Sequence, residues 1–396
     1  MIIVIIGAVF FVLDCIPKGG IPITRQIMGA TAIAAIFSFI CFYSTDYNRT
    51  DDYTYATYVV SFFVWLSAAY GIGKIIRFEH GKFDFTVLIY YLAGVCFVQC
   101  ALALMIDEIP LVKNVVTTYI WNNANFYTEI DRLYGIGAAL DPAGVRFAVV
   151  LILVAALLCH SDYVRSKKKI ITQLMIAFFT ISLIGNMISR TTITGVVMAL
   201  VYFVMYSGII SLRLKGRYFK FYFIFSTVLV TAIIVSTILY NVNSAFHDHL
   251  RFGFEGFFNW TETGEWSTNS TDKLDREMWI WPTDTKTWVI GSGLFGLFIY
   301  NTDVGYCRFI LYCGIIGFSS FAWLFIYSAV SFWRRSKEIR WVFLFLLALA
   351  FVIWIKVATD IFFIFALFYC LDHLDIVRLN YNRIEPDPEL VEIEQN

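Results

Sequence analysis

The stretch NMISRTTITGV, residues 186–196, places one arginine, Arg190, between two long apolar runs. The run ITQLMIAFFTISLIG (171–185) precedes it and VVMALVYFVMYSGII (196–210) follows it, with almost no loop between them. The spans predicted around these runs, 170–188 and 192–211, reach the roughly 17–25 residues that a helix needs to cross a bilayer. The pattern predicts two membrane-spanning helices joined by a tight turn. A guanidinium in that turn lies at the membrane boundary, where an unpaired charge is costly, so Arg190 needs an anionic partner.

The composition of the whole chain predicts the same class of protein. Of its 396 residues, 59% are hydrophobic and only 15% are charged, and the mean hydropathy is +0.71. A soluble domain of this size cannot bury so much apolar surface. We therefore predict an all-α fold, a polytopic transmembrane helical bundle that forms one integral membrane domain over residues 1–396.

The hydropathy pattern predicts about eleven spans with short, basic connectors between alternate spans. The connectors include SDYVRSKKKI (161–170) and RRSKEIR (334–340), and the positive-inside rule places them in the cytoplasm. The spans are expected near residues 1–15, 27–44, 56–73, 85–106, 145–160, 170–188, 192–211, 220–240, 304–331, 341–356 and 360–376.

This topology places two long loops together on the other, periplasmic side. They are a first outer loop over 107–144 and a large cap loop over 241–303, whereas the acidic tail 384–396 is cytoplasmic. An odd number of spans also puts the N-terminus outside. Either the first segment does not cross fully, or an upstream helix brings the number to twelve.

The charges predicted to face outward are mostly arginines. Arginine stays charged and presents a planar fork that matches phosphate oxygens, which predicts recognition of a diphosphate. The alternative is that each arginine reaches the lipid headgroups or pairs with a nearby acid such as Asp131, Glu277 or Asp303. For Arg190 we favour a ligand, because its turn holds threonines and no acid. The outward arginines are Arg49, Arg132, Arg146, Arg190, Arg251, Arg276 and Arg308.

Two further stretches carry candidate site residues. In DRLYGIGAALDPAGVRF (131–147), Arg132 and Arg146 bracket a glycine-rich turn, for which a simple helix-capping loop is the competing interpretation. In the stretch 275–317, Arg276 precedes a GSG turn that could approach a ligand closely. Asp303 follows at the mouth of a span, with Arg308 one turn inside. Asp303 is either a base that orients an attacking hydroxyl or the N-cap of the next helix.

Aromatic and imidazole side chains complete the predicted site. Five tryptophans lie in 241–303, and Trp281 and Tyr306 are candidates to stack on sugar rings. His247 and His249 form an HxH pair, for which an interfacial position is favoured over a metal site. No nucleotide-binding or metalloprotease motif is found, so we predict no metal and no cofactor. An arginine-rich, aromatic site beside lipid indicates a lipid-linked glycan as substrate and gives no sign of nucleic acid.

The layout resembles the superfamily of O-antigen polymerases and O-antigen ligases of bacterial envelopes. SRTTITGVVMAL (189–200) resembles the short outer turn of that family, and RLYGIGAALDPAGVRF (132–147) resembles its loop ahead of a span. The segment 275–317 resembles the large outer loop, with an arginine and a tryptophan before a glycine-rich turn. By this resemblance Arg190 contacts the lipid diphosphate, and Arg132 and Arg276 are the arginines of the two loops. TDVGYCR (302–308) lacks the histidine typical of ligases, which favours a polymerase.

The resemblance implies a metal-independent membrane glycosyltransferase in the bacterial cytoplasmic membrane, with its active site facing the periplasm. It would join undecaprenyl-diphosphate-linked repeat units into O-antigen or capsular polysaccharide. Lipid-linked oligosaccharides would be donor and acceptor, membrane lipid would surround the site, and a chain-length regulator protein is a further expected partner. Arg190, Arg276 and Arg132 would hold and stabilise the leaving diphosphate. Asp303 would act on the acceptor hydroxyl, ahead of His247 and His249. A ligase, a flippase or transporter of lipid-linked sugars and, more weakly, an acyltransferase are the alternatives.

Overall fold

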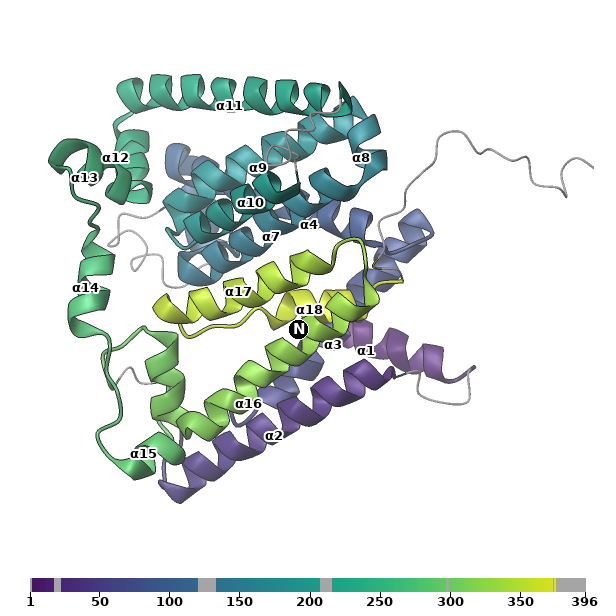
Figure 1. Cartoon of the computed structure of the whole chain (residues 1–396), viewed down its shortest axis with the longest axis vertical. Helices are drawn as coiled ribbons and strands as arrows, with labels where there is room; N and C mark the ends of the chain where they lie inside the picture. The colour runs from purple at the N-terminus through teal and green to yellow at the C-terminus, as the bar shows by residue number, and fades with distance from the viewer. Residues whose placement is uncertain are drawn as a thin grey trace, which may run out of the picture.

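The computed structural model describes residues 2–17, 23–119, 133–206, 216–296, 299–372 and 374. The described chain is helical, in agreement with the predicted all-α class (Figure 1). The helices that fall within the predicted spans are α1 (Ile2–Cys15), α2 (Arg25–Tyr47), α3 (Tyr58–His80), α4 (Phe85–Glu108), α7 (Leu140–His160), α9 (Lys168–Ile188), α10 (Thr192–Tyr206), α11 (Gly216–Val242), α16 (Gly305–Arg335), α17 (Arg340–Lys356) and α18 (Phe362–Tyr369). The remaining helices are α5 (Pro110–Tyr119), α8 (Asp162–Ser166), α12 (Ser244–Gly253), α13 (Glu255–Thr263), α14 (Asn269–Glu277) and α15 (Thr285–Val289).

Seven helices in the described chain are long and apolar enough to cross a membrane, so this is a multi-pass membrane protein. They are α2, α3, α4, α7, α9, residues 223–242 of α11, and α16. Within the described residues, the segments predicted near 1–15, 192–211, 341–356 and 360–376 contain the shorter helices α1, α10, α17 and α18. Even α17, with 17 residues, is about 25 Å long, slightly less than a hydrocarbon core of roughly 30 Å. The number of eleven spans therefore stays a prediction.

The bundle has two groups of helices. One group consists of α1, α2, α3 and α16, and the other of α4, α7, α9, α10 and α11. Helix α17 packs against α16 on one side and against α7 and α10 on the other, so that it joins the two groups. The end of α17 therefore lies where side chains of both groups can meet.

Helices α7 and α11 show how burial follows from sequence within the second group. In α7 the residues from Ala143 to Leu158 are apolar on every side, except Arg146, and 83% of its spanning window is buried. A helix that is hydrophobic all round is expected at the centre of a bundle. In α11 only 6% of the window is buried, because it packs mainly on α9 and α12. Helix α11 therefore presents most of its surface to lipid.

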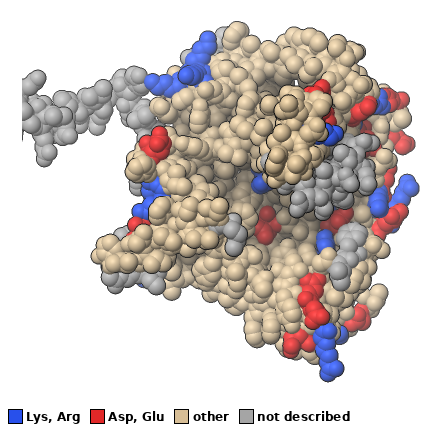
Figure 2. All heavy atoms as spheres, turned by 180° about the vertical axis from the view of Figure 1, so that it is seen from behind, with Lys and Arg blue, Asp and Glu red and all other residues tan. Residues whose placement is uncertain are grey.

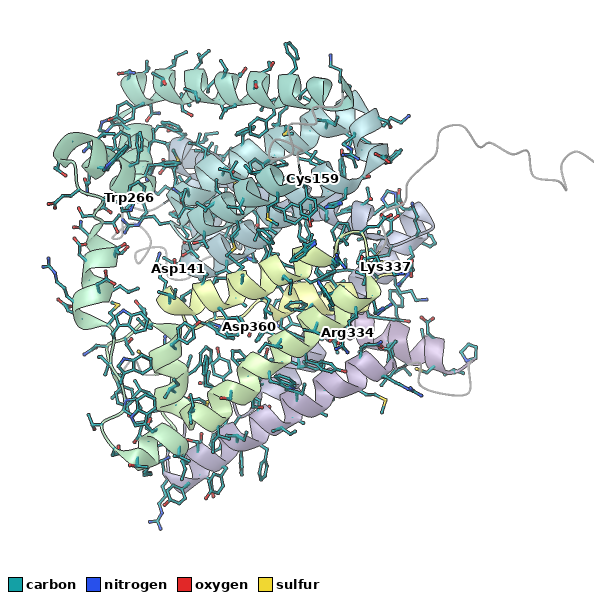
Figure 3. All side chains as sticks on the ribbon, in the orientation of Figure 1. Asp141, Cys159, Trp266, Arg334, Lys337 and Asp360 are labelled. Atoms are coloured by element: carbon teal, nitrogen blue, oxygen red, sulfur yellow. The ribbon has the colours of Figure 1, made fainter. Side chains whose placement is uncertain are left out.

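Helices α12 to α15, residues 244–289, form a cap at one end of the bundle, along the left edge of Figure 1. Trp266 of the cap lies at this end in Figure 3, whereas Arg334 and Lys337 of a basic connector lie at the other. The cap and this connector therefore lie at opposite ends of the bundle. Parts of the predicted first outer loop (120–132) and the whole predicted tail 384–396 lie outside the described residues.

Helix α16 is interrupted at Gly314, whose backbone is left-handed with φ 68°. The GSG turn of the cap packs against this break. The N–H groups of Ser292 and Gly293 donate to the carbonyls of Leu311 (2.7 Å) and Tyr312 (2.9 Å). These bonds satisfy carbonyls that the break leaves without a partner in the helix. The GSG turn was expected to approach a ligand, but its close approach is to the backbone of α16.

A second interruption separates α17 from α18. Residues 357–361 are not helical, and the indole of Trp354 donates to the carbonyl of Thr359 at 2.7 Å. Asp360 accepts the backbone N–H of Phe362 at 2.8 Å. Irregular backbone at membrane depth is tolerated only inside protein or beside a water-filled cavity. In Figure 3, Asp360 lies among the helices near the middle of the molecule.

Candidate functional site

Arg190 lies in the predicted tight turn. Helix α9 ends at Ile188, and α10 begins at Thr192, whose hydroxyl donates to the carbonyl of Gly185 at 2.9 Å. This bond ties the first residue of α10 to the last turn of α9. Arg190 is therefore held at the cap end of two adjacent helices.

The anionic partner of Arg190 comes from the cap. The guanidinium forms an ion pair with Glu255 at the start of α13, and only 13% of the arginine side chain is exposed. The guanidinium also lies over the ring of Phe252, 4.6 Å from its centroid. The second oxygen of Glu255 accepts the backbone N–H of Asn269 at 3.0 Å. The turn itself holds no acid, but the fold supplies one, so Arg190 has a carboxylate partner in this structure.

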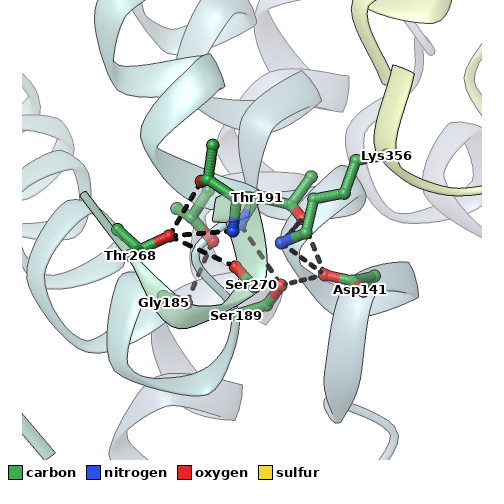
Figure 4. A network of polar contacts seen from close by, with 9 residues as sticks. Asp141, Gly185, Ser189, Thr191, Thr268, Ser270 and Lys356 are labelled. Carbon is green, nitrogen blue, oxygen red and sulfur yellow. Dashed lines mark hydrogen bonds and ion pairs between the residues drawn. The ribbon is translucent and has the colours of Figure 1, made fainter. Parts of the chain in front are cut away.

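The two chain neighbours of Arg190, Ser189 and Thr191, belong to a second polar group (Figure 4). Asp141, in the first turn of α7, accepts hydrogen bonds from Ser189 (2.9 Å) and Thr191 (2.7 Å). The ammonium of Lys356, the last residue of α17, lies 3.3 Å from Asp141 and 3.3 Å from the hydroxyl of Thr191. Ser189 and Thr191, which flank Arg190 in the chain, are thus hydrogen-bonded to Asp141. The ion pair between Asp141 and Lys356 links α7 to α17.

Arg190, Thr191 and Lys356 line a cavity of about 350 Å³ between the cap and the bundle. Most of its lining surface is apolar, and its charged lining residues are Arg190, Lys356 and Asp275; we call it the polar cavity because of these charges. Ile193, Phe254 and Phe257 belong to its apolar lining. The same three residues line a second, apolar cavity of about 510 Å³ bounded by α9, α10 and α11. The polar cavity is also lined by Asn186, Thr191, Thr194, Gly253, Gly256, Trp266, Thr268, Ser270, Thr271, Leu274, Asp275, Val352, Ile353 and Ile355.

Asp303 lies just before α16, a helix of the group that also contains α1, α2 and α3. Helix α16 begins at Gly305, and its N-cap is Val304, whose N–H donates to the hydroxyl of Thr302 at 3.2 Å. The alternative interpretation of Asp303 as the N-cap is therefore wrong. Asp303 is exposed, yet the surrounding protein displaces enough water to raise the pKa of its carboxyl.

Nearby charges act on Asp303 in both directions. The Asp141 carboxylate raises its pKa further, while Arg308, Lys273 and Lys356 lower it. Charged residues of α7, α14, α16 and α17 therefore lie close enough to Asp303 to act on its carboxyl group. Figure 2 shows the molecule from behind with a hollow near its centre, and acidic and basic side chains lie in and around the hollow.

Two other predicted arginines bind backbone carbonyls. Arg308 donates to the carbonyl of Phe295 at 2.9 Å and lies over that ring, 4.3 Å from its centroid. Arg146 donates to the carbonyls of Gly137 and, at 3.4 Å, Pro142. Both arginines hold turns at the cap end of the bundle in this structure.

Arg251 and the two histidines have partners within or near the cap. Arg251 pairs with Glu262 at 2.9 Å. The ring of His247 contacts Asp248 at 2.9 Å, and that of His249 contacts Asp107 at 3.1 Å. The histidines therefore have different partners, and no cluster of metal-ligating side chains occurs in the part of the chain that the structure describes.

The remaining predicted residues are spread along the cap and α16. Arg276 is exposed in the last turn of α14. Trp281 stacks on Trp288, with ring centroids 5.7 Å apart, and is 40% exposed. Tyr306 is half-buried, and its hydroxyl donates to the carbonyl of Phe351 at 2.9 Å. Arg132 lies outside the described residues.

Glu255, Asp141 and Lys356 were not predicted as site residues, although they surround Arg190. A signal for Lys356 was present in the sequence: FVIWIKVATDIFF (351–363) holds a lysine and an aspartate inside an otherwise apolar stretch. Ionisable residues inside membrane segments mark functional sites more often than not. No comparable signal marks Glu255, because its contact with Arg190 depends on how the cap folds.

Comparison with known proteins finds no family model, no curated protein and no solved structure that matches this chain.

Proposed function

We propose that this protein is a membrane glycosyltransferase that polymerises undecaprenyl-diphosphate-linked repeat units on the outer face of the bacterial cytoplasmic membrane. The observation that supports the proposal is that two neighbouring cavities share three lining residues. A polar cavity with Arg190 and Lys356 in its wall shares Ile193, Phe254 and Phe257 with an apolar cavity against α11. This arrangement fits a molecule with an anionic head and a long apolar tail.

The positions of the two cavities suit such a lipid. The apolar cavity is lined by Leu229, Ile233 and Tyr240 of α11, the helix most exposed to lipid. A polyprenyl tail could enter beside α11 and remain partly in the bilayer. Its diphosphate would then reach the cap end of α9 and α10, where a guanidinium fork matches phosphate oxygens better than a point charge does.

In the proposed glycosyl transfer, Asp303 and Arg190 have separate roles. A sugar hydroxyl of the acceptor attacks the anomeric carbon of the donor, and the bond from that carbon to the diphosphate oxygen breaks. Asp303 accepts the hydroxyl proton, for which a raised pKa is suitable. Undecaprenyl diphosphate leaves with the bonding electrons, and Arg190 stabilises its charge. Arg276 and Arg132 remain further candidates for the diphosphate, and Trp281 for a sugar ring.

A flippase or transporter of lipid-linked sugars is the second candidate, and one observation favours it. Transporters often bind substrates where membrane helices are discontinuous. Here α16 is interrupted at Gly314, and residues 357–361 interrupt the path from α17 to α18. The ligase of the same superfamily remains a third candidate, since it would use the same lipid-linked donor.

Replacement of Arg190 distinguishes these functions. In a host that depends on this protein, Arg190→Ala and Arg190→Lys should reduce the polymer to single repeats that still reach the cell surface. Accumulation of single repeats inside the cell would support the flippase instead. Lys286→Met is the matched control, because Lys286 lies on α15 of the cap and contacts Asn48. Purified protein should also extend a lipid-linked repeat in the presence of a chelator.

A further inference from the structure

We infer that Lys356 is the second cation of the anion site and that it makes the site selective for a diphosphate over a monophosphate. The inference rests on the proposed function and names the feature of the lipid head that the cavity recognises. It concerns a residue that lies 166 positions from Arg190 in the chain, on a different helix.

The position of Lys356 fits this role. It is the last residue of α17, where the carbonyl end of the helix favours a cation. Its side chain is 32% exposed, and it lines the same polar cavity as Arg190. Thr191 joins the two cations: it follows Arg190 directly, and its hydroxyl lies 3.3 Å from the ammonium. Arg190 and Lys356 therefore flank one polar region.

The contacts of Lys356 are compatible with an additional anionic ligand. Its ammonium lies 3.3 Å from Asp141, longer than the roughly 2.7–2.9 Å of a close charge-assisted hydrogen bond. Asp141 also accepts bonds from Ser189 and Thr191, so its carboxylate is held by three donors. Asp141 thus acts as a positioning residue, which holds the ammonium of Lys356 in the wall of the cavity.

The chemistry of the two cations explains the expected selectivity. The fork of Arg190 can hold two oxygens of one phosphate, whereas the ammonium of Lys356 is a compact charge. A diphosphate offers a second phosphate to Lys356, but a monophosphate does not. A hydrogen bond to a charged group contributes about 1.5–3 kcal/mol, which corresponds to roughly a ten- to hundredfold change in affinity.

The test measures binding of farnesyl diphosphate, farnesyl monophosphate and farnesol to the full-length protein in lipid nanodiscs. We expect the protein to bind the diphosphate at least tenfold more tightly than the monophosphate. Lys356→Met should remove that preference while the monophosphate affinity changes by less than about threefold, and Lys356→Arg should keep much of it. Lys286→Met is the control and should behave as the unmodified protein.

A double variant separates ligand binding from a structural ion pair. If Lys356 only joins α17 to α7, then Asp141→Asn together with Lys356→Met should restore the diphosphate preference, and the inference is overturned. If Lys356 binds the ligand, the double variant stays unselective, and thermal unfolding confirms that it is folded. An unmodified protein that binds all three lipids equally contradicts the proposed function as well. A diphosphate preference that survives in Lys356→Met contradicts the inference alone.

Discussion

Glu255 of the cap forms an ion pair with Arg190, although 65 positions separate them in the chain. The carboxylate is held from both sides, since its other oxygen accepts the N–H of Asn269 at 3.0 Å. A carboxylate and a phosphate oxygen compete for the same guanidinium fork. Under the proposed function, a lipid diphosphate must therefore displace Glu255, which couples binding to a movement of the cap.

Glu255→Gln should strengthen diphosphate binding. The glutamine can still accept the N–H of Asn269 but no longer neutralises Arg190, so we expect roughly tenfold tighter binding of farnesyl diphosphate. Isothermal titration in nanodiscs measures the affinity. Glu262→Gln is the control, because Glu262 pairs with Arg251 in the same cap. Weaker binding by Glu255→Gln would show that the pair supports the site instead of competing for it.

The pH dependence should report on Asp303. Because its pKa is raised, the acid limb of the pH–activity profile should lie above the ordinary range of an aspartate, and activity should fall below that pKa as the base is protonated. Asp303→Asn should reduce kcat by about 10² to 10⁴-fold. An asparagine variant with full activity and an unchanged acid limb would remove Asp303 from the mechanism.

The raised pKa of Asp303 also has a consequence for stability, with a definite sign. Between the ordinary pKa and the raised pKa, the folded protein binds more protons than the unfolded chain does, so stability decreases as pH rises through this window. Asp303→Asn should remove this contribution. Thermal unfolding in detergent across the window measures it, and a protein that gains stability there through Asp303 would contradict the sign.

The apolar cavity can be filled from α11. Ala232 lines this cavity, and Ala232→Trp should obstruct it and raise the KM for a polyprenyl substrate severalfold with little change in the melting temperature. Val235 is 48% exposed on the same helix and does not line the cavity, so Val235→Trp is the matched control. Equal KM values for the two variants would place the lipid tail elsewhere.

Gly314 should not tolerate a side chain. Its φ of 68° is unfavourable for other residues, and an added Cβ would lie 2.1 Å from the carbonyl oxygen of Val289. We expect Gly314→Ala to lower the free energy of unfolding by about 2 kcal/mol or more. Gly94→Ala is the control, since nothing lies within 4 Å of the added Cβ. Similar denaturation curves for both variants would show that the backbone around Gly314 can rearrange to accept a side chain at little cost in stability.

Several expectations about the helices hold because membrane insertion is a local property. The apolar runs on either side of Arg190 become α9 and α10, and the span predicted over 145–160 lies within the buried α7. The free energy of inserting a helix is close to a sum over about 20 consecutive residues, so hydropathy alone locates such segments. The segment predicted over 360–376 was less accurate, because α18 covers only Phe362–Tyr369.

The sequence by itself determined that this is a multi-pass helical membrane protein, and it identified Arg190 as a charge in need of an anion. Only the tertiary structure decided that Glu255 is its partner, that Asp141 and Lys356 lie beside it, and that α16 breaks at Gly314 against the GSG turn. The reason is physical. Hydrophobic transfer is additive along a segment, whereas the pairing of charges and the capping of a broken helix depend on groups that come together only after distant segments have packed.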